Sequence, residues 1–248
     1  DIALKALLAG VLQQREHHLG LAGKKRGAKQ QQERDNASNI EGALISLNPY
    51  TGEIISHVGG YSFSTQNQID HVSQSFRQPG SSFKPIVYAA AVQDRDITPS
   101  TIFNLGRVTV RDALCRSINI VAVEVLEKTG YSTVFRILQN GLELSDGDLH
   151  TRFGRTLSLA LGAYEVSPLE NSVLYSLLVN GGNFIKPYGM RYVKDYNGNI
   201  VWNNEDEVRR HTEEKRVKLG KIIDPRACSV TVSMLRGVFE DGGTAYYA

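Results

Sequence analysis

Arg77-Gln78-Pro79-Gly80-Ser81-Ser82-Phe83-Lys84-Pro85 combines a chain break, a serine and a lysine in one short stretch. A glycine that follows a proline permits a sharp turn, and the apolar spacing from Phe83 to Ala91 predicts a helix that begins at Ser81. Three residues are close to one helical turn. Lys84 is therefore expected on the same face as Ser81, with its amine within reach of the hydroxyl.

This pair of side chains suits nucleophilic catalysis. A serine at its ordinary pKa is a poor nucleophile and needs an adjacent base, and partial burial lowers the pKa of a lysine so that its neutral amine becomes available. Ser82 is the competing serine, but the residue three positions after it is Pro85, which cannot act as a base. Ser81 is therefore predicted to be the nucleophile and Lys84 its activating partner.

A second polar motif follows at Ser117-Ile118-Asn119, 36 residues after Ser81 (117 − 81). On a loop between two helices, the Ser117 hydroxyl can relay a proton and the Asn119 amide can hold a substrate amide carbonyl. Taken alone, such a pair is more often a helix cap. Its significance comes from following Ser81 and Lys84.

The two motifs in this order resemble the penicillin-recognising serine acyltransferases, and the surrounding sequence is similar to the transpeptidase domain of class A penicillin-binding proteins. The resemblance covers residues 40–248. It is carried, besides the motifs above, by Asn48-Pro-Tyr-Thr-Gly-Glu53, Val58-Gly-Gly60, Val108-Thr-Val-Arg-Asp-Ala-Leu114, Leu161-Gly-Ala-Tyr-Glu-Val-Ser-Pro-Leu-Glu170 and Asn180-Gly-Gly182.

That resemblance implies a peptidoglycan D,D-transpeptidase. Ser81 would form an acyl-enzyme with the D-Ala-D-Ala end of a stem peptide, and an amine of a second stem would resolve it into a cross-link. β-Lactam antibiotics would acylate the same serine. The positions that match the family's site are Ser81, Lys84, Ser117 and Asn119, with Asn119 also binding substrate; neither cofactor nor metal is implied.

The family's third motif, Lys-Thr/Ser-Gly on a strand, has a misleading counterpart here. Lys128-Thr129-Gly130 follows Asn119 too closely and ends a predicted helix, where Gly130 serves as a natural cap. The family places the motif shortly after a segment like 234–245. The resemblance therefore implies that the motif, three sheet strands and a last helix belong after residue 248, and that a longer stretch is usual near 104–107.

The expected fold is α+β and β-lactamase/transpeptidase-like: an antiparallel sheet flanked by helices, with a helical subdomain. Strands are predicted at 42–48, 53–58, 190–195 and 199–202. Helices are predicted from residue 81, at 108–116, 118–129, 131–140, 166–180 and 224–240, whereas 204–221 is expected to be a charged surface stretch. Residues 1–19 are predicted to form an amphipathic helix, followed by a polar, basic linker to residue 39.

Composition narrows the class of protein. A formal net charge of +2 over 248 residues gives no support for a nucleic-acid partner, and no apolar run is long enough to span a membrane. His57, His71 and His150 lack metal-ligand spacing.

The resemblance implies that residues 1–39 connect to a preceding glycosyltransferase domain and membrane anchor. The protein would then work on the outer side of the bacterial cytoplasmic membrane.

Other functions use the same residues. A D,D-carboxypeptidase or β-lactamase could share Ser81 and Lys84, although no deacylating base for a β-lactamase is evident. A non-catalytic β-lactam sensor or scaffold is the alternative from a different class. Stable acylation without turnover of stem peptide would indicate a sensor, and no acylation at all would indicate a scaffold.

Overall fold

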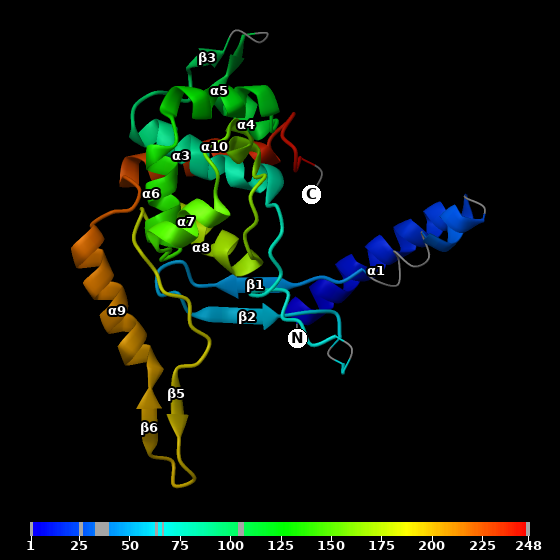
Figure 1. The fold of residues 1–248 in the computed structure, drawn as a ribbon, viewed down its shortest axis with the longest axis vertical. Helices are drawn as coiled ribbons and strands as arrows, with labels where there is room; N and C mark the ends of the chain where they lie inside the picture. Colours follow the sequence, from blue (N-terminus) through cyan, green and yellow to red (C-terminus); the bar gives the residue numbers. More distant parts are fainter. Residues whose placement is uncertain are drawn as a thin grey trace. The chain divides into compact units, whose positions relative to one another are not determined.

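The computed structural model describes residues 2–24, 27–32, 40–62, 64–65, 67–103 and 107–246. The chain divides into two compact units (Figure 1). The first comprises residues 1–46, 54–76 and 167–169, and the second comprises 47–53, 77–166 and 170–248. The fold combines helices with small antiparallel sheets, which confirms the α+β prediction.

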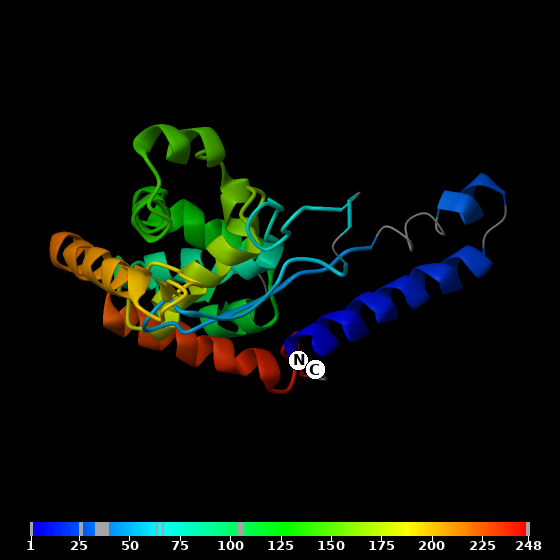
Figure 2. The ribbon, with the colours of Figure 1, turned by 90° about the horizontal axis from the view of Figure 1, so that it is seen from below.

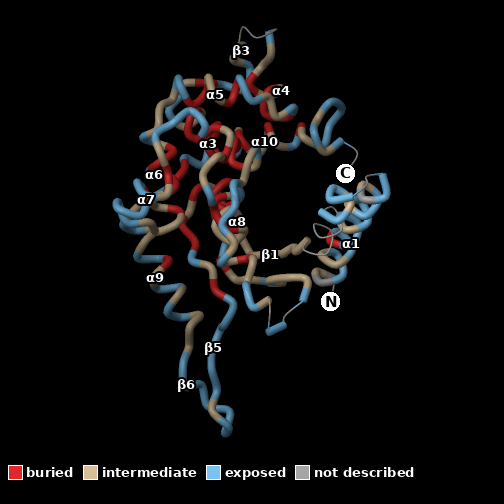
Figure 3. Tube along the Cα trace, turned by 45° about the vertical axis from the view of Figure 1, so that its right-hand side comes forward, coloured by how far each residue is buried: buried red, intermediate tan, exposed pale blue. Residues whose placement is uncertain are grey.

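The core of the second unit is built around α3 (Lys84–Gln93). All residues from Lys84 to Ala91 are buried, and α3 packs against α5 (Asn119–Thr129) and α10 (Pro225–Arg236). Figure 3 shows buried residues concentrated along these helices. The small side chains of Ala89, Ala90 and Ala91 allow neighbouring elements to approach closely. The turn at the N-terminal end of α3 is thereby attached to the most rigid part of the unit.

Two further helices of this unit begin at a residue whose side chain caps the first turn. Thr109 caps α4 (Val110–Cys115), and Ser145 caps α7 (Asp146–Arg152), each by accepting a hydrogen bond from a first-turn N–H. The unit also contains α6 (Ser132–Gly141), most of α8 (Pro168–Val179) and three 3-10 turns, η1 (Gly80–Phe83), η2 (Leu157–Leu161) and η3 (Gly237–Phe239).

The stretch 204–221, predicted only as charged surface, forms the helix α9 (Asn204–Leu219), and the sequence analysis did not identify it as a helix. Its only buried side chain is that of Thr212, so no apolar face marks it in the sequence. Asn203 caps it, acidic residues occupy its first turn, and basic residues occupy its last. Figure 2 shows α9 leading into α10. The short helix α7 was also missed.

Strands occur only as pairs within the described residues: β1 (Leu44–Leu47) with β2 (Ile54–Val58), β3 (Ile102–Phe103) with β4 (Val108–Thr109), and β5 (Tyr192–Lys194) with β6 (Ile200–Asn203). Strands β1, β2 and β5 lie within their predicted ranges, and β6 ends one residue beyond its range. The predicted 108–116 helix begins later, because Val108 pairs with Phe103. The stretch 104–106, where a longer segment was expected, lies outside the described residues.

The first unit contains α1 (Ile2–Gly23), longer than predicted, and β2. Val11 is buried, but Leu12 and Leu19 are exposed, so the predicted apolar face is only partly realised. Arg15 donates to the Ile40 carbonyl at 2.8 Å and lies over the Tyr61 ring. None of the described helices has the length and apolar character needed to cross a membrane.

Candidate active site

Ser81 lies in η1, a single 3-10 turn directly before α3, rather than in the α-helix that was predicted. Gly80 has a φ of +58°, a conformation that favours glycine, and it lets the chain reverse before the serine. The Ser81 side chain is exposed, and it makes no hydrogen bond to the described residues. Its hydroxyl is therefore free for a reaction partner.

The turn that carries Ser81 contacts another backbone segment at Gly162, which ends η2. The Gly80 N–H donates to the Gly162 carbonyl at 3.2 Å. Gly162 has a φ of +67°, and a Cβ atom there would lie 2.2 Å from the Gly80 carbonyl oxygen. A side chain at position 162 would displace the turn, so this glycine is needed for the close approach.

Lys84 is 1% exposed and donates three hydrogen bonds to one loop. Its Nζ lies 2.6 Å from the Ser117 carbonyl oxygen, 2.9 Å from Ser117 Oγ and 2.7 Å from Asn119 Oδ1. Burial lowers the pKa of Lys84 below its ordinary value. The structure thus brings three of the four predicted residues into direct contact. Among the described residues, no hydrogen bond joins Lys84 to Ser81, although both border one cavity.

Ser117 occupies a strained backbone conformation between α4 and α5. Its φ is +55°, which costs a non-glycine residue on the order of 1–2 kcal/mol. The Ile118 N–H bonds to the Ala113 carbonyl at 2.8 Å and holds the loop in this shape. This conformation directs both the carbonyl and the hydroxyl of Ser117 at Lys84. Asn119, the first residue of α5, adds its side-chain oxygen.

Ser81, Lys84 and Ser117 border a cavity of about 440 Å³. Apolar residues of α4, α10 and η3 also border it. Sequence reasoning did not assign the cavity residues outside the motifs, which are Pro85, Leu114, Tyr175, Leu235, Val238, Phe239 and Thr244. Of these, Pro85, Leu114 and the residues of the segment 234–245 lie in stretches quoted for the family resemblance, whereas Tyr175 does not.

The Lys128-Thr129-Gly130 sequence lies at the end of α5, as predicted. Gly130 has a φ of +75° at the helix cap, and its N–H donates to the Leu126 carbonyl at 2.7 Å. The lysine and threonine belong to the last helical turn rather than to a strand. None of the three residues borders the cavity.

Other reactive groups offer no competing site. Cys115 and Cys228 are buried free thiols, and burial raises the pKa of both, so neither is a ready nucleophile. Among the described residues, no three His, Cys, Asp or Glu side chains are placed to hold a metal ion. Glu170 forms a two-pronged ion pair with Arg152.

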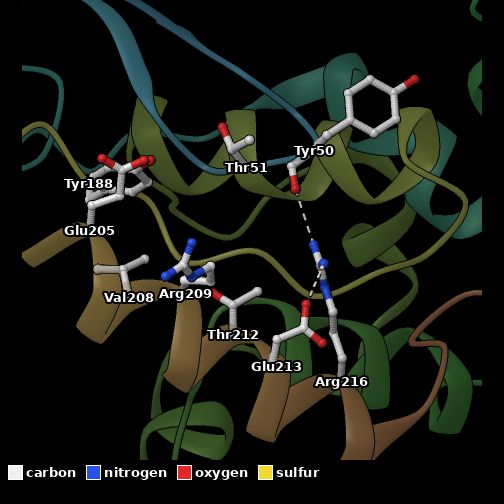
Figure 4. A pocket seen from close by; sticks show the side chains of 9 residues that line it. All are labelled: Tyr50, Thr51, Tyr188, Glu205, Val208, Arg209, Thr212, Glu213 and Arg216. Carbon is white, nitrogen blue, oxygen red and sulfur yellow. Dashed lines mark hydrogen bonds and ion pairs between the residues drawn. The ribbon is translucent and has the colours of Figure 1, made fainter. Parts of the chain in front are cut away.

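A second, smaller cavity of about 230 Å³ lies between α9 and the turn after β1 (Figure 4). Arg216 crosses it and donates to the Tyr50 carbonyl at 3.1 Å and to the Phe184 carbonyl at 2.9 Å, and it also pairs with Glu213. These bonds join α9 to two loops. Arg216 is fully engaged in them, which identifies a structural role.

Comparison with known proteins identifies the family of the chain. The family model of the penicillin-binding protein transpeptidase domain matches residues 42–248. Penicillin-binding protein 1A of Rickettsia conorii is 30% identical over 197 residues, covering 67% of this chain and 23% of that protein. Penicillin-binding protein 1A of Aquifex aeolicus is 30% identical over 227 residues, covering 82% and 29%.

A solved structure is similar to this chain as well. The crystal structure of penicillin-binding protein 1A from Haemophilus influenzae matches with a TM-score of 0.58 and 28% identity over 66% of this chain and 27% of that one. The chain thus spans about a quarter of the proteins that it resembles. The family match over most of its length shows that the chain belongs to the penicillin-binding protein transpeptidase domain family.

Proposed function

We propose that this chain carries the D,D-transpeptidase site of a peptidoglycan-synthesising enzyme, with Ser81 as its nucleophile. The observation that carries the proposal is the buried Lys84 amine, bonded to Ser117 and Asn119 at the cavity that Ser81 borders. A lysine buried this deeply needs a reason beyond fold stability, because desolvating its charge is costly.

Acylation follows from the positions of these groups. The neutral Lys84 amine accepts the Ser81 proton while Oγ attacks the carbonyl carbon of the penultimate D-alanine. The Ser81 backbone N–H, which has no acceptor among the described residues, is available to the developing oxyanion. Lys84 then returns the proton through Ser117 Oγ to the leaving nitrogen. The C–N bond breaks, D-alanine leaves, and a Ser81 ester remains.

Transfer reverses these proton movements. The amine of a second stem peptide attacks the ester carbonyl, its surplus proton passes to Lys84 through Ser117, and the Ser81 alkoxide leaves and recovers a proton. With its Oδ1 held by Lys84, the Asn119 side chain presents Nδ2 as a donor to a substrate amide carbonyl. A β-lactam would acylate Ser81 by the same first step, with its ring amide nitrogen as the leaving group.

The domain organisation forms part of the same proposal. Residues 40–248 would be the transpeptidase domain, and residues 1–39 would connect it to a glycosyltransferase domain and membrane anchor on the outer side of the cytoplasmic membrane. Support comes from the family match beginning at residue 42 and from relatives that are several times longer than this chain.

The intact mass before and after incubation with benzylpenicillin tests the function. We expect one added penicillin, mapped by peptide analysis to Ser81 and absent from Ser81→Ala. Ser132→Ala, an exposed serine outside the cavity, is the matched control and should acylate normally. Cross-linking of a stem peptide to an amine acceptor would then separate a transpeptidase from a sensor. An adduct that persists in Ser81→Ala would disprove the assignment.

A further inference from the structure

The 3-10 turn that carries Ser81 lacks one of its own backbone hydrogen bonds. In such a turn, each carbonyl accepts from the N–H three residues later. The Ser82 carbonyl would accept from residue 85, but residue 85 is proline and has no N–H. The turn keeps the bonds from the Ser82 N–H to the Pro79 carbonyl and from the Lys84 N–H to the Ser81 carbonyl, but residue 85 adds none where the turn meets α3.

Tyr175 supplies the missing donor. Its hydroxyl donates to the Ser82 carbonyl at 2.7 Å, across 93 residues of sequence. Tyr175 stands on α8 and borders the same cavity as Ser81. Burial raises the pKa of the phenol, so it stays protonated and remains a donor throughout the neutral range.

We propose that Tyr175 is a positioning residue for the nucleophile, holding the Ser81 turn through the Ser82 carbonyl, to which Pro85 cannot donate. The proposal rests on the proposed function of Ser81. Ser82 Oγ is already committed to the Pro79 carbonyl at 2.8 Å, and Gly162 holds only the Gly80 end of the turn. Tyr175 restrains the end nearer Lys84.

A displaced nucleophile slows the chemical step more than it weakens binding, because reactive geometry tolerates little error. Tyr175→Phe keeps the ring and removes only the donor. We expect its acylation rate constant at saturating benzylpenicillin to fall about tenfold, with the non-covalent Kd within about twofold of the parent. The midpoint of its pH profile should not move, since the phenol transfers no proton.

Ser176→Ala is the matched control. Ser176 is buried on the same helix and its hydroxyl bonds to the Ser172 carbonyl at 2.9 Å, away from the turn. It should lose a comparable hydrogen bond while keeping the parental acylation rate. The double variant Tyr175→Phe/Pro85→Ala restores a backbone donor at residue 85, and it should acylate faster than Tyr175→Phe alone.

The outcomes are distinguishable. Parental acylation by Tyr175→Phe, an equal loss in Ser176→Ala, or a double variant no faster than Tyr175→Phe would each overturn the positioning role while leaving Ser81 as nucleophile. A parent protein that forms no Ser81 adduct would overturn the proposed function, and the role of Tyr175 with it.

Discussion

Lys84 Nζ lies 2.9 Å from Ser117 Oγ, although 33 residues separate them in the sequence. The contact joins the first residue of α3 to a strained loop before α5. Because Ser117 also offers its carbonyl to the same amine, the loop conformation and the state of the lysine are coupled. The first predictions follow from this coupling.

Acylation should accelerate as the pH rises. Burial lowers the pKa of Lys84, so the neutral amine that accepts the Ser81 proton becomes populated below the ordinary lysine range. We expect the second-order rate constant for benzylpenicillin to increase with pH, with a midpoint below 10.5, the ordinary lysine value. Rates measured at constant ionic strength would contradict this if the midpoint stayed at that value or the profile were flat.

A comparison of Ser117→Gly with Ser117→Ala should separate the effect of backbone strain from the effect of losing the hydroxyl. Both variants lose the hydroxyl, and both should acylate at least tenfold more slowly. Glycine adopts the φ of +55° without penalty, so Ser117→Gly should be more stable than Ser117→Ala by roughly 1 kcal/mol. Chemical denaturation measures the difference. Equal stabilities would show that the backbone at Ser117 is not strained.

Gly162→Ala should damage the nucleophile turn. The new Cβ would lie 2.2 Å from the Gly80 carbonyl oxygen, and the segment must shift. We expect a loss of stability of roughly 2 kcal/mol or more, together with slower acylation. Gly130→Ala is the control, because its φ is also positive but no atom lies within 4 Å of the added Cβ. If the two variants behaved alike, the close approach at Gly162 would have no special importance.

Glu143→Gln should remove an acid-sensitive part of the stability. Burial alone would raise the pKa of Glu143, but hydrogen bonds from Lys186, His211 and Lys215 outweigh it and lower the pKa to about 2. A depressed carboxyl pKa stabilises the fold above the ordinary value of 4.5, and this contribution is lost as the pH falls from there towards 2.

We expect Glu143→Gln to be destabilised by roughly 1–3 kcal/mol at pH 7, with a smaller difference from the parent at pH 3. Urea titrations at the two pH values measure it. The exposed ion pair Asp206–Arg209 provides the comparison, because Asp206→Asn should cost less than about 1 kcal/mol. A penalty for Glu143→Gln that is the same at both pH values would contradict the assignment.

Local sequence was sufficient wherever neighbours along the chain decide the structure. The spacing of Ser81 and Lys84, the two hairpin turns and the cap at Gly130 depend on residues only a few positions apart, and all were predictable. The charged helix α9 was not predictable from its local sequence. Its stability comes from caps, end charges and ion pairs rather than from an apolar face, so the usual periodicity is missing.

The geometry of the candidate site was decided by tertiary structure. The sequence by itself determined which residue types were present for the chemistry, and it placed Ser81 and Lys84 on adjacent turns. Only the packing of α3 against α5 turned the Lys84 amine towards Ser117 and Asn119 and buried it. The proline at position 85 shows in the sequence that one backbone N–H is missing. That Tyr175 donates to the Ser82 carbonyl depends on where α8 lies, because a donor 93 residues away in the sequence leaves no local pattern.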